Sequence, residues 1–266
     1  MKTEIVKKTS GRKITLIILI IIISAFVIYY SIMSMMSPGN KLAEIKREFA
    51  VKPTENNAAG ERVYYDSSYL KLLKEKAFLQ SRTVMAETDS IYLTINLEDR
   101  TSGIEINGVV VHKTKISNFA ISKILIEGDE NVILTMLASP FTIASSYATI
   151  KKEPVMIKMA PKDTSEYKPD IMPDTSIIVP VNYRLDMTNG TRIYVYQEEN
   201  EKVADKINLI RFNVRERLHD TWSSLKSVAL FKVPEYHPFI KIRIPRIDAK
   251  IIYRALPKHG QIAIYR

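Results

Sequence analysis

Histidine is the side chain that most often carries acid–base chemistry or binds a metal near neutral pH. The sequence contains four, which are His112, His219, His237 and His259. None of them stands in an HExxH, HxH or His-carboxylate pattern that would bind a metal or form a charge relay. The spacing therefore predicts that each is a surface or capping residue, and we expect no metal site and no cofactor.

Other reactive groups are scarce in this chain. It contains no cysteine, which excludes disulfides, thiolate metal sites and a cysteine nucleophile. The acidic pairs Asp129-Glu130 and Glu198-Glu199 lie at expected element edges, where solvated turns are commoner than acid–base pairs. Eight glycines in 266 residues form no phosphate-binding loop. Asn189-Gly190-Thr191 fits a glycosylation sequon, but Asn-Gly is a turn dipeptide first, so a turn is favoured.

The most informative segment lies at the end of the chain. It contains Ile242-Arg243-Ile244, then Asp248-Ala249, Tyr253 and the apolar run Ile262–Ile264. This order resembles the C-terminal signature of the L,D-transpeptidase (YkuD-type) catalytic domain. There, Ser-His-Gly-Cys-Ile-Arg-Leu precedes Asp-Ala, a Leu-Tyr helix, a proline and a closing strand. Residues 91–113, with an Asn-Gly turn before Val-Val, are similar to the first hairpin of that family, so the resemblance covers both ends of residues 90–266.

The segment departs from the family pattern where catalysis is decided. Lys241 stands at the position of the nucleophilic cysteine, Ile240 at the preceding glycine and Phe239 at the histidine before it, whereas Arg243 is retained. The second family histidine would fall near residues 194–197, and the chain has no histidine between His112 and His219. Acyl transfer needs an activated nucleophile with a base in reach. The resemblance therefore implies a domain that has lost catalysis, and Lys241 as a nucleophile, which requires a deprotonated amine, is the lesser alternative.

The rest of the pattern predicts many short strands. Residues 91–97 alternate apolar and polar side chains, and Asn107-Gly108 between β-branched residues is a strong hairpin signal. A helix is expected from residue 66 to about residue 80. Further strands are expected at residues 119–126, 132–137, 155–159, 176–183, 193–196, 239–244, 250–254 and 262–265. We therefore expect a mainly β fold, a sandwich or barrel of the L,D-transpeptidase type.

One long helix interrupts the predicted strands. Between residues 200 and 231, apolar residues recur at helical spacing, at Val203, Ile207, Ile210, Val214, Leu218, Trp222, Leu225 and Ala229. The helix is an insertion relative to the family. Its apolar face either packs on the β core or belongs to an added docking element. Basic residues off that face are candidate partner contacts, namely Arg211, Arg215, Arg217 and Lys226.

Residues 14–36 contain no charged side chain, and a helix of that length crosses a hydrocarbon core of about 30 Å. Five basic residues precede this run, so the positive-inside rule places residues 1–13 in the cytoplasm. Residues 37–40 (Ser-Pro-Gly-Asn) are expected to end the helix, and residues 37–61 to form a stalk. Residues 62–266 would then form an extracytoplasmic, periplasmic domain of a single-pass protein with a signal anchor.

The distribution of charge along the chain indicates which class of partner the protein binds. Residues 202–266 carry 14 basic and five acidic side chains, yet they lack the aromatic interleaving of a nucleic-acid platform, and the expected compartment offers no nucleic acid. We therefore expect a membrane-anchored, catalytically inactive module that binds or scaffolds peptidoglycan or an envelope protein. The alternatives are an active wall-modifying enzyme with non-standard residues and a structural subunit of a secretion or motility complex.

Overall fold

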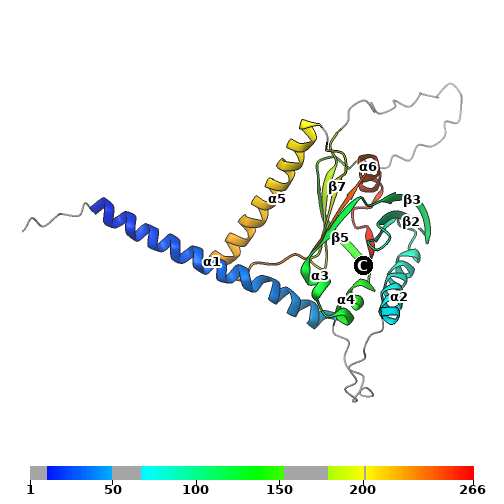
Figure 1. The fold of residues 1–266 in the computed structure, drawn as a ribbon, viewed down its shortest axis with the longest axis horizontal. Coiled ribbons are helices and arrows are strands. Elements are labelled where there is room, and N and C mark those ends of the chain that lie inside the picture. Colours follow the sequence, from blue (N-terminus) through cyan, green and yellow to red (C-terminus); the bar gives the residue numbers. More distant parts are fainter. Residues whose placement is uncertain (1–10, 50–66, 153–178, 201) are drawn as a thin grey trace, which may run out of the picture. The chain divides into compact units, whose positions relative to one another are not determined.

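The computed structural model describes residues 11–49, 67–152, 179–200 and 202–266 (Figure 1). The chain divides into two compact units. One comprises Met1–Ala43 and Glu216–Tyr236, and the other comprises Glu44–Arg215 and His237–Arg266. The expected strand at residues 155–159 lies outside the described residues, as do most of the N-terminal tail and residues 50–61 of the expected stalk.

The larger unit is built on one mixed sheet of nine strands. The strands are β1 (Tyr92–Asn96), β2 (Thr101–Ile106), β3 (Val109–Lys115), β4 (Asn118–Ile121), β5 (Phe141–Ala148), β6 (Asn182–Met187), β7 (Arg192–Gln197), β8 (Phe239–Ile244) and β9 (Gln261–Tyr265). Their order across the sheet is β3-β2-β1-β9-β5-β6-β7-β8-β4. The β1–β9 and β7–β8 pairs are parallel and the other pairs are antiparallel.

The sheet curls back on itself. β3 and β4 lie at opposite ends of the strand order, yet only Ile116 and Ser117 separate them in the chain. Ile116 N–H donates to the Arg100 carbonyl next to β2, and Ser117 N–H donates to the Arg243 carbonyl of β8. Because two residues span less than about 8 Å, the two edges of the sheet are close together.

The curled sheet encloses one apolar core. Along each strand alternate side chains point inward, so Ile95 of β1, Val195 of β7 and Ile242 of β8 belong to the same buried cluster. Helices α4 (Glu130–Leu137) and α6 (Arg246–Ala255) add Ile133 and Ile252 to this cluster. The short helix α3 (Lys123–Glu127) precedes α4. Helices α4 and α6 therefore share one buried core with strands from both halves of the described sheet.

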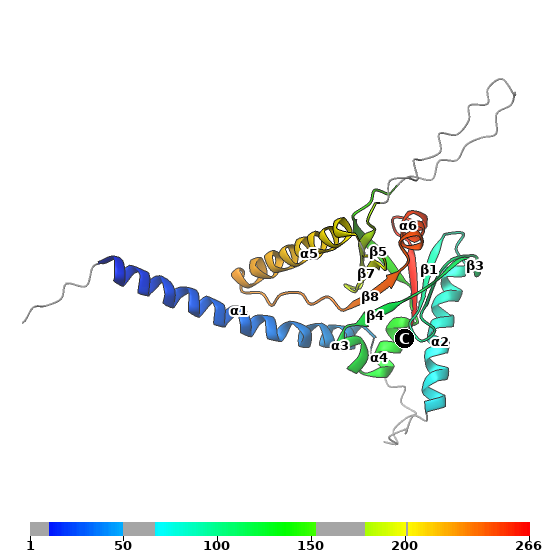
Figure 2. The ribbon, with the colours of Figure 1, turned by 45° about the horizontal axis from the view of Figure 1, so that its top comes forward.

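Two further helices cover the outer faces of the sheet. Helix α2 (Ser67–Ala86) packs Met85 and Phe78 against Tyr92 of β1 and Ala263 of β9. Helix α5 (Val203–Ala229) packs Phe212 against Tyr194 and Tyr196 of β7. Figures 1 and 2 show α2 along the β1–β3 side of the sheet and the N-terminal half of α5 beside β7.

Two Asn-Gly turns form as the sequence predicts. Asn107 and Gly108 have φ angles of 50° and 81°, the pair of positive values that a two-residue hairpin requires. Gly190 has a φ angle of 79°, and the Asn189 side chain accepts from Thr191 N–H at 3.0 Å. Asn189 therefore lies in the turn between β6 and β7.

Several strand predictions are wrong. Residues 132–137 form most of helix α4, and residues 250–254 lie in helix α6. The strand expected at 119–126 ends at Ile121 and is followed by α3. Short apolar runs do not distinguish a strand from a buried helix by periodicity, and Asp129 caps α4 through a bond from Asn131 N–H. β6 begins at Asn182, near the end of the strand expected at 176–183, and β5 was not predicted.

The N-terminal helix α1 runs from Gly11 to Phe49 and is long and apolar enough to cross a membrane. The prediction that residues 37–40 end this helix is wrong, because Pro38 lies inside it. Tertiary contacts on both sides of Pro38 compensate for the backbone hydrogen bond that proline cannot donate. Ser37 Oγ donates to the Pro234 carbonyl at 2.6 Å, and Ile45 is buried in the core of the larger unit.

The long predicted helix is present as α5, but its apolar face does not pack on the β core. Val203, Ile207, Ile210, Val214, Leu218 and Trp222 are all exposed. Asp205, Phe212 and Glu216, on the opposite side of the helix, are buried instead. The expectation that the apolar face covers the sheet is therefore wrong.

Candidate functional site

The C-terminal signature segment forms β8, α6 and β9, and β8 pairs in parallel with β7. Tyr194 of β7 pairs with Lys241 of β8. Strand alternation sends Ile240 into the core, where it is 2% exposed, and leaves Phe239, Lys241 and Arg243 on the outer face. The structure therefore places Lys241, where the resemblance implies a cysteine, beside the start of residues 194–197, the range near which it implies the second histidine.

Basic and aromatic side chains alternate on this outer face. Lys241 Nζ lies 4.7 Å from the ring centre of Phe239 and 5.4 Å from that of Tyr194. Arg243 Cζ lies 5.9 Å from the ring centre of Tyr196. These are cation–π distances. We call this surface the aromatic–basic face and define it by Tyr147, Tyr194, Tyr196, Phe239, Lys241 and Arg243.

Helix α5 covers the aromatic–basic face. The Phe212 ring stacks on Tyr147 with centres 5.6 Å apart and meets the edge of Tyr196 at 6.0 Å. Arg215 Cζ lies 4.8 Å from the Tyr147 ring centre. Asn213 Oδ1 accepts from Tyr196 Oη at 3.2 Å. Residues from the inserted helix thus occupy the space over β7 and β8.

An ion cluster holds the neighbouring strands. Asp186 Oδ1 lies 2.9 Å from Arg184 Nε and 3.2 Å from Arg192 Nε, and Ser145 Oγ donates to Asp186 Oδ2 at 2.7 Å. At the start of α5, Arg246 donates to the buried Asp205 carboxylate at 2.7 Å. Charged side chains are therefore used to join β5, β6, β7, α5 and α6.

The aromatic–basic face is rich in groups that bind through cation–π contacts. The aromatic–basic face contains one amine, one guanidinium and four aromatic rings, and none of these side chains is a histidine or a carboxylate that would take a proton from a nucleophile. The Lys241 ammonium packs on the Phe239 and Tyr194 rings at cation–π distances.

One histidine does meet a carboxylate, which sequence reasoning missed. His112 Nε2 of β3 lies 3.0 Å from Asp248 Oδ1, and Thr114 Oγ1 donates to Asp248 Oδ2 at 2.5 Å. The threonine bonds the aspartate and not the histidine, so these residues do not form a nucleophile–base relay. Asp248 lies in the first turn of α6 and ties that helix to β3. In the sequence, Asp248 was marked only by its match to the aspartate of the Asp-Ala pair in the L,D-transpeptidase signature.

The remaining histidines act as the sequence predicts. His237 Nδ1 lies 3.0 Å from the Gly190 carbonyl, and His259 Nδ1 lies 3.2 Å from the Ile143 carbonyl. His219 is an exposed residue of α5. In the described ranges, no group of three or more His, Cys, Asp or Glu side chains is arranged to hold a metal ion.

Tyr253, at the family's helix tyrosine, lies in the core rather than on the aromatic–basic face. Its ring centre is 4.9 Å from that of Tyr183 and 5.3 Å from Lys152 Nζ. Burial raises the pKa of Tyr183 far above its usual value and lowers the pKa of Lys152. These shifts follow from desolvation of packed side chains.

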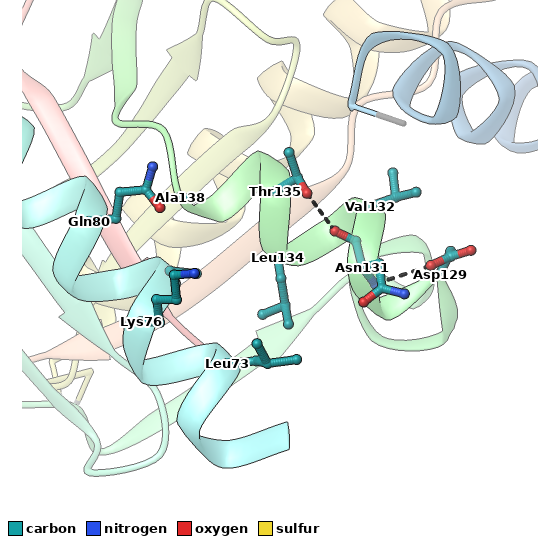
Figure 3. Close-up of a pocket in the computed structure, with 10 residues that line it drawn as sticks. Leu73, Lys76, Gln80, Asp129, Asn131, Val132, Leu134, Thr135 and Ala138 are labelled. Atoms are coloured by element: carbon teal, nitrogen blue, oxygen red, sulfur yellow. Dashed lines mark hydrogen bonds between the residues drawn. The ribbon is translucent and has the colours of Figure 1, made fainter. Parts of the chain in front are cut away.

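A pocket of about 630 Å³ lies between α2 and α4 (Figure 3). Leu73, Lys76 and Gln80 of α2 face Asp129, Asn131 and Thr135. Asp129 accepts from Asn131 N–H at 3.1 Å, and Thr135 Oγ1 donates to the Asn131 carbonyl at 2.8 Å. The Asp129 Oδ1 atom, the Asn131 backbone groups and the Thr135 hydroxyl serve the helix itself, which leaves Lys76 as the basic side chain of the pocket. We therefore place the functional site at β7–β8.

The structure does not gather the four predicted partner-binding residues into one site. Arg215 packs on Tyr147, whereas Arg211, Arg217 and Lys226 are exposed along α5. Comparisons with protein-family models, with curated proteins and with solved structures found no match.

Proposed function

We propose that this protein is a membrane-anchored, catalytically inactive module with an L,D-transpeptidase-like sandwich or barrel fold, and that it binds or scaffolds components of the cell envelope. In this proposal α1 is the anchor, residues 1–13 are cytoplasmic and the β domain is periplasmic. The partner is an envelope protein or the peptidoglycan stem peptide.

The single observation that carries the proposal is the pairing of Tyr194 with Lys241 beneath Phe212. Lys241 stands where the resemblance implies the catalytic cysteine, and Tyr194 begins the range, residues 194–197, near which it implies the second histidine. Their side chains are packed against each other and covered by an inserted helix, so a substrate carbonyl would find neither a nucleophile nor a base. Inactivity follows from the residue types and from the occupied space together.

The curled sheet supports the fold part of the proposal. The β1–β2–β3 hairpin and the β8–α6–β9 segment, which carry the resemblance, adjoin through the parallel β1–β9 pair. The signature segment thus forms a strand, a helix and a closing strand in the order that the resemblance implies.

Activity of the full-length protein in detergent tests the proposal. Incubation with wall tetrapeptide is expected to give no transpeptidation, no carboxypeptidation and no acyl adduct in mass spectrometry, while an active L,D-transpeptidase in the same micelles gives all products. Turnover that disappears in Lys241→Ala but persists in Tyr194→Phe would refute inactivity and favour the lysine nucleophile.

Affinity purification tests the scaffolding role. The tagged full-length protein, extracted from membranes, is expected to co-elute with an envelope protein or with stem-peptide fragments. A tagged variant with α1 alone serves as the control, because it shares the anchor and lacks the β domain. Equal recovery with both baits would contradict a binding role for the domain.

A further inference from the structure

Helix α5 carries an exposed apolar stripe from Val203 to Trp222, beyond which Leu225 is half-buried and Val228 is buried. Six large apolar side chains spaced three or four residues apart form it, and they are Val203, Ile207, Ile210, Val214, Leu218 and Trp222. Just after the helix, Leu230 and Phe231 are also exposed, with 81% of Phe231 accessible. Trp222 is 70% exposed. An apolar surface of this extent on a folded chain marks an interaction surface.

Charged residues of α5 are sorted around this stripe. Of the three acidic residues of α5, Asp205 and Glu216 are buried on the opposite side of the helix, whereas the Asp220 side chain is 40% exposed. Basic residues adjoin the stripe in sequence: Arg211 follows Ile210, Lys226 follows Leu225 and Arg217 precedes Leu218. A central apolar stripe with lysine and arginine at its edges is typical of a helix that lies in the interface of a membrane with anionic lipids.

The smaller unit places the end of this helix next to the apolar part of α1. The Phe231 ring centre lies 6.0 Å from that of Tyr29, and Ser37 Oγ donates to the Pro234 carbonyl at 2.6 Å. Figures 1 and 2 both show the orange C-terminal end of α5 beside α1. Tyr29 is seven residues before Met36, the last residue of the uncharged run, which is about 10 Å along a helix.

These contacts set the depth of Phe231 in a bilayer. If α1 spans the membrane with residues 14–36, Phe231 lies about 10 Å inside the end of the span, whereas Pro234 lies at its end beside Ser37. Interfacial helices bury their apolar face about 5–10 Å below the headgroups. A protein partner would have to reach this depth, but acyl chains are already there.

We infer that the C-terminal half of α5, together with Leu230 and Phe231, lies in the membrane leaflet at the Met36 end of α1. Leu218 and Trp222 contact acyl chains, and Arg217, Lys226 and Lys232 contact anionic headgroups. The inference rests on the proposed membrane anchoring by α1. It assigns the lipid bilayer as the occupant of the C-terminal part of the exposed stripe, Leu218 and Trp222.

The single tryptophan of the chain tests this inference without any substitution. Full-length protein is placed in nanodiscs of phosphatidylethanolamine and phosphatidylglycerol, with and without lipids brominated on their acyl chains. Trp222 is expected to lose roughly half of its fluorescence to the brominated lipids and to be shielded from aqueous acrylamide. Quenching by acrylamide with none by brominated lipid would overturn the inference.

Matched variants separate the stripe from the rest of the helix. Leu218→Glu is expected to reduce quenching by brominated lipid several-fold, whereas Ser223→Glu, at an exposed position one residue beyond Trp222 and off the stripe, leaves it unchanged. Replacing phosphatidylglycerol by phosphatidylcholine is expected to weaken quenching, because the basic edge loses its counter-charge. Equal quenching in both variants would contradict the inference.

A fluorophore on α1 distinguishes failure of the α5 inference from failure of the anchoring proposal. Because the chain has no cysteine, Ile22→Cys accepts one fluorophore that reports insertion of α1. Quenched Ile22 label with unquenched Trp222 overturns the α5 inference alone, and an unquenched Ile22 label overturns anchoring and the inference together. Trp222 shielded from acrylamide but unquenched by brominated lipid would overturn the inference in favour of a second copy covering the stripe.

Discussion

Tyr194 and Lys241 are register partners in parallel strands, with Lys241 Nζ 5.4 Å from the centre of the Tyr194 ring. The ammonium group also lies 4.7 Å from the Phe239 ring. The Lys241 ammonium group is thus held between two aromatic rings. Its contribution to stability can therefore be measured by substitution.

Lys241→Ala should lower the free energy of unfolding by about 1 kcal/mol, because two cation–π contacts are lost. Lys241→Arg should retain most of the stability, since guanidinium also stacks on aromatic rings. Urea unfolding of full-length protein in detergent, followed by circular dichroism, measures both. Equal loss in the two variants would show that the cation contributes nothing.

The orientation of α5 predicts opposite effects for two neighbouring apolar residues. Phe212 is 2% exposed and Ile210 is 61% exposed. In detergent, Phe212→Ala should cost about 3–5 kcal/mol through loss of buried ring contacts, and Ile210→Ala should cost about 0.5 kcal/mol or less. The same unfolding measurement decides between them. A larger cost at Ile210 would mean that the apolar stripe packs on the sheet after all.

Asp248 should couple energetically to His112. The two side chains come from α6 and β3 and lie 3.0 Å apart, so removing either one leaves a partner without its bond. A double-mutant cycle with Asp248→Ala and His112→Ala should give a coupling of about 0.5–1.5 kcal/mol. His259→Ala, which lies elsewhere, provides the control and should be additive with Asp248→Ala.

Alkaline pH should destabilise the β domain through Tyr265. Burial, and then a hydrogen bond to Glu98, raise the pKa of Tyr265 to about 12, from 10.0. Between these values the unfolded chain loses the phenol proton while the folded chain keeps it, so the contribution is complete below pH 10 and is lost as pH rises to about 12. Urea midpoints at pH 9 and pH 11 should fall less in Tyr265→Phe than in the natural chain. Identical falls would contradict a perturbed Tyr265.

Protease accessibility tests the proposed topology. Because Lys2, Lys7, Lys8, Arg12 and Lys13 precede the span, protease added outside spheroplasts should digest the β domain and leave residues 1–13 protected. Lysed spheroplasts provide the control, in which both sides are exposed. Protection of the β domain in intact spheroplasts would reverse the orientation.

Local chemistry in the sequence was sufficient for several elements. Alternation predicted β1 and β8, helical spacing predicted α5, and Asn107-Gly108 predicted the β2–β3 turn. The uncharged run predicted a helix long enough to cross a membrane, which the structure shows as part of α1. These features need only contacts between residues close in the chain, so their pattern is visible in the sequence.

Other elements depended on partners distant in the chain. The run at 132–137 fits a strand or a helix, and packing of Ile133 and Met136 into the core selects the helix. β5 alternates weakly, because Ser145 and Ser146 lie in its middle, and it is defined by pairing with β6 and β9. Pro38 ends a helix by local rules, yet the bond from Ser37 and the burial of Ile45 keep α1 continuous.

The features on which the proposed function rests also divide into those set by the sequence and those set by the tertiary structure. The sequence by itself determined that residues 239, 240 and 241 are Phe, Ile and Lys, and that no cysteine stands among them. Only the tertiary structure decided that Lys241 lies beside Tyr194, that Phe212 covers Tyr196 and that the apolar stripe of α5 faces outward. An amphipathic pattern specifies a helix with two faces, but the buried Asp205–Arg246 ion pair and the Phe212 ring contacts select which face meets the sheet. Those contacts join residues that only the folded chain brings together.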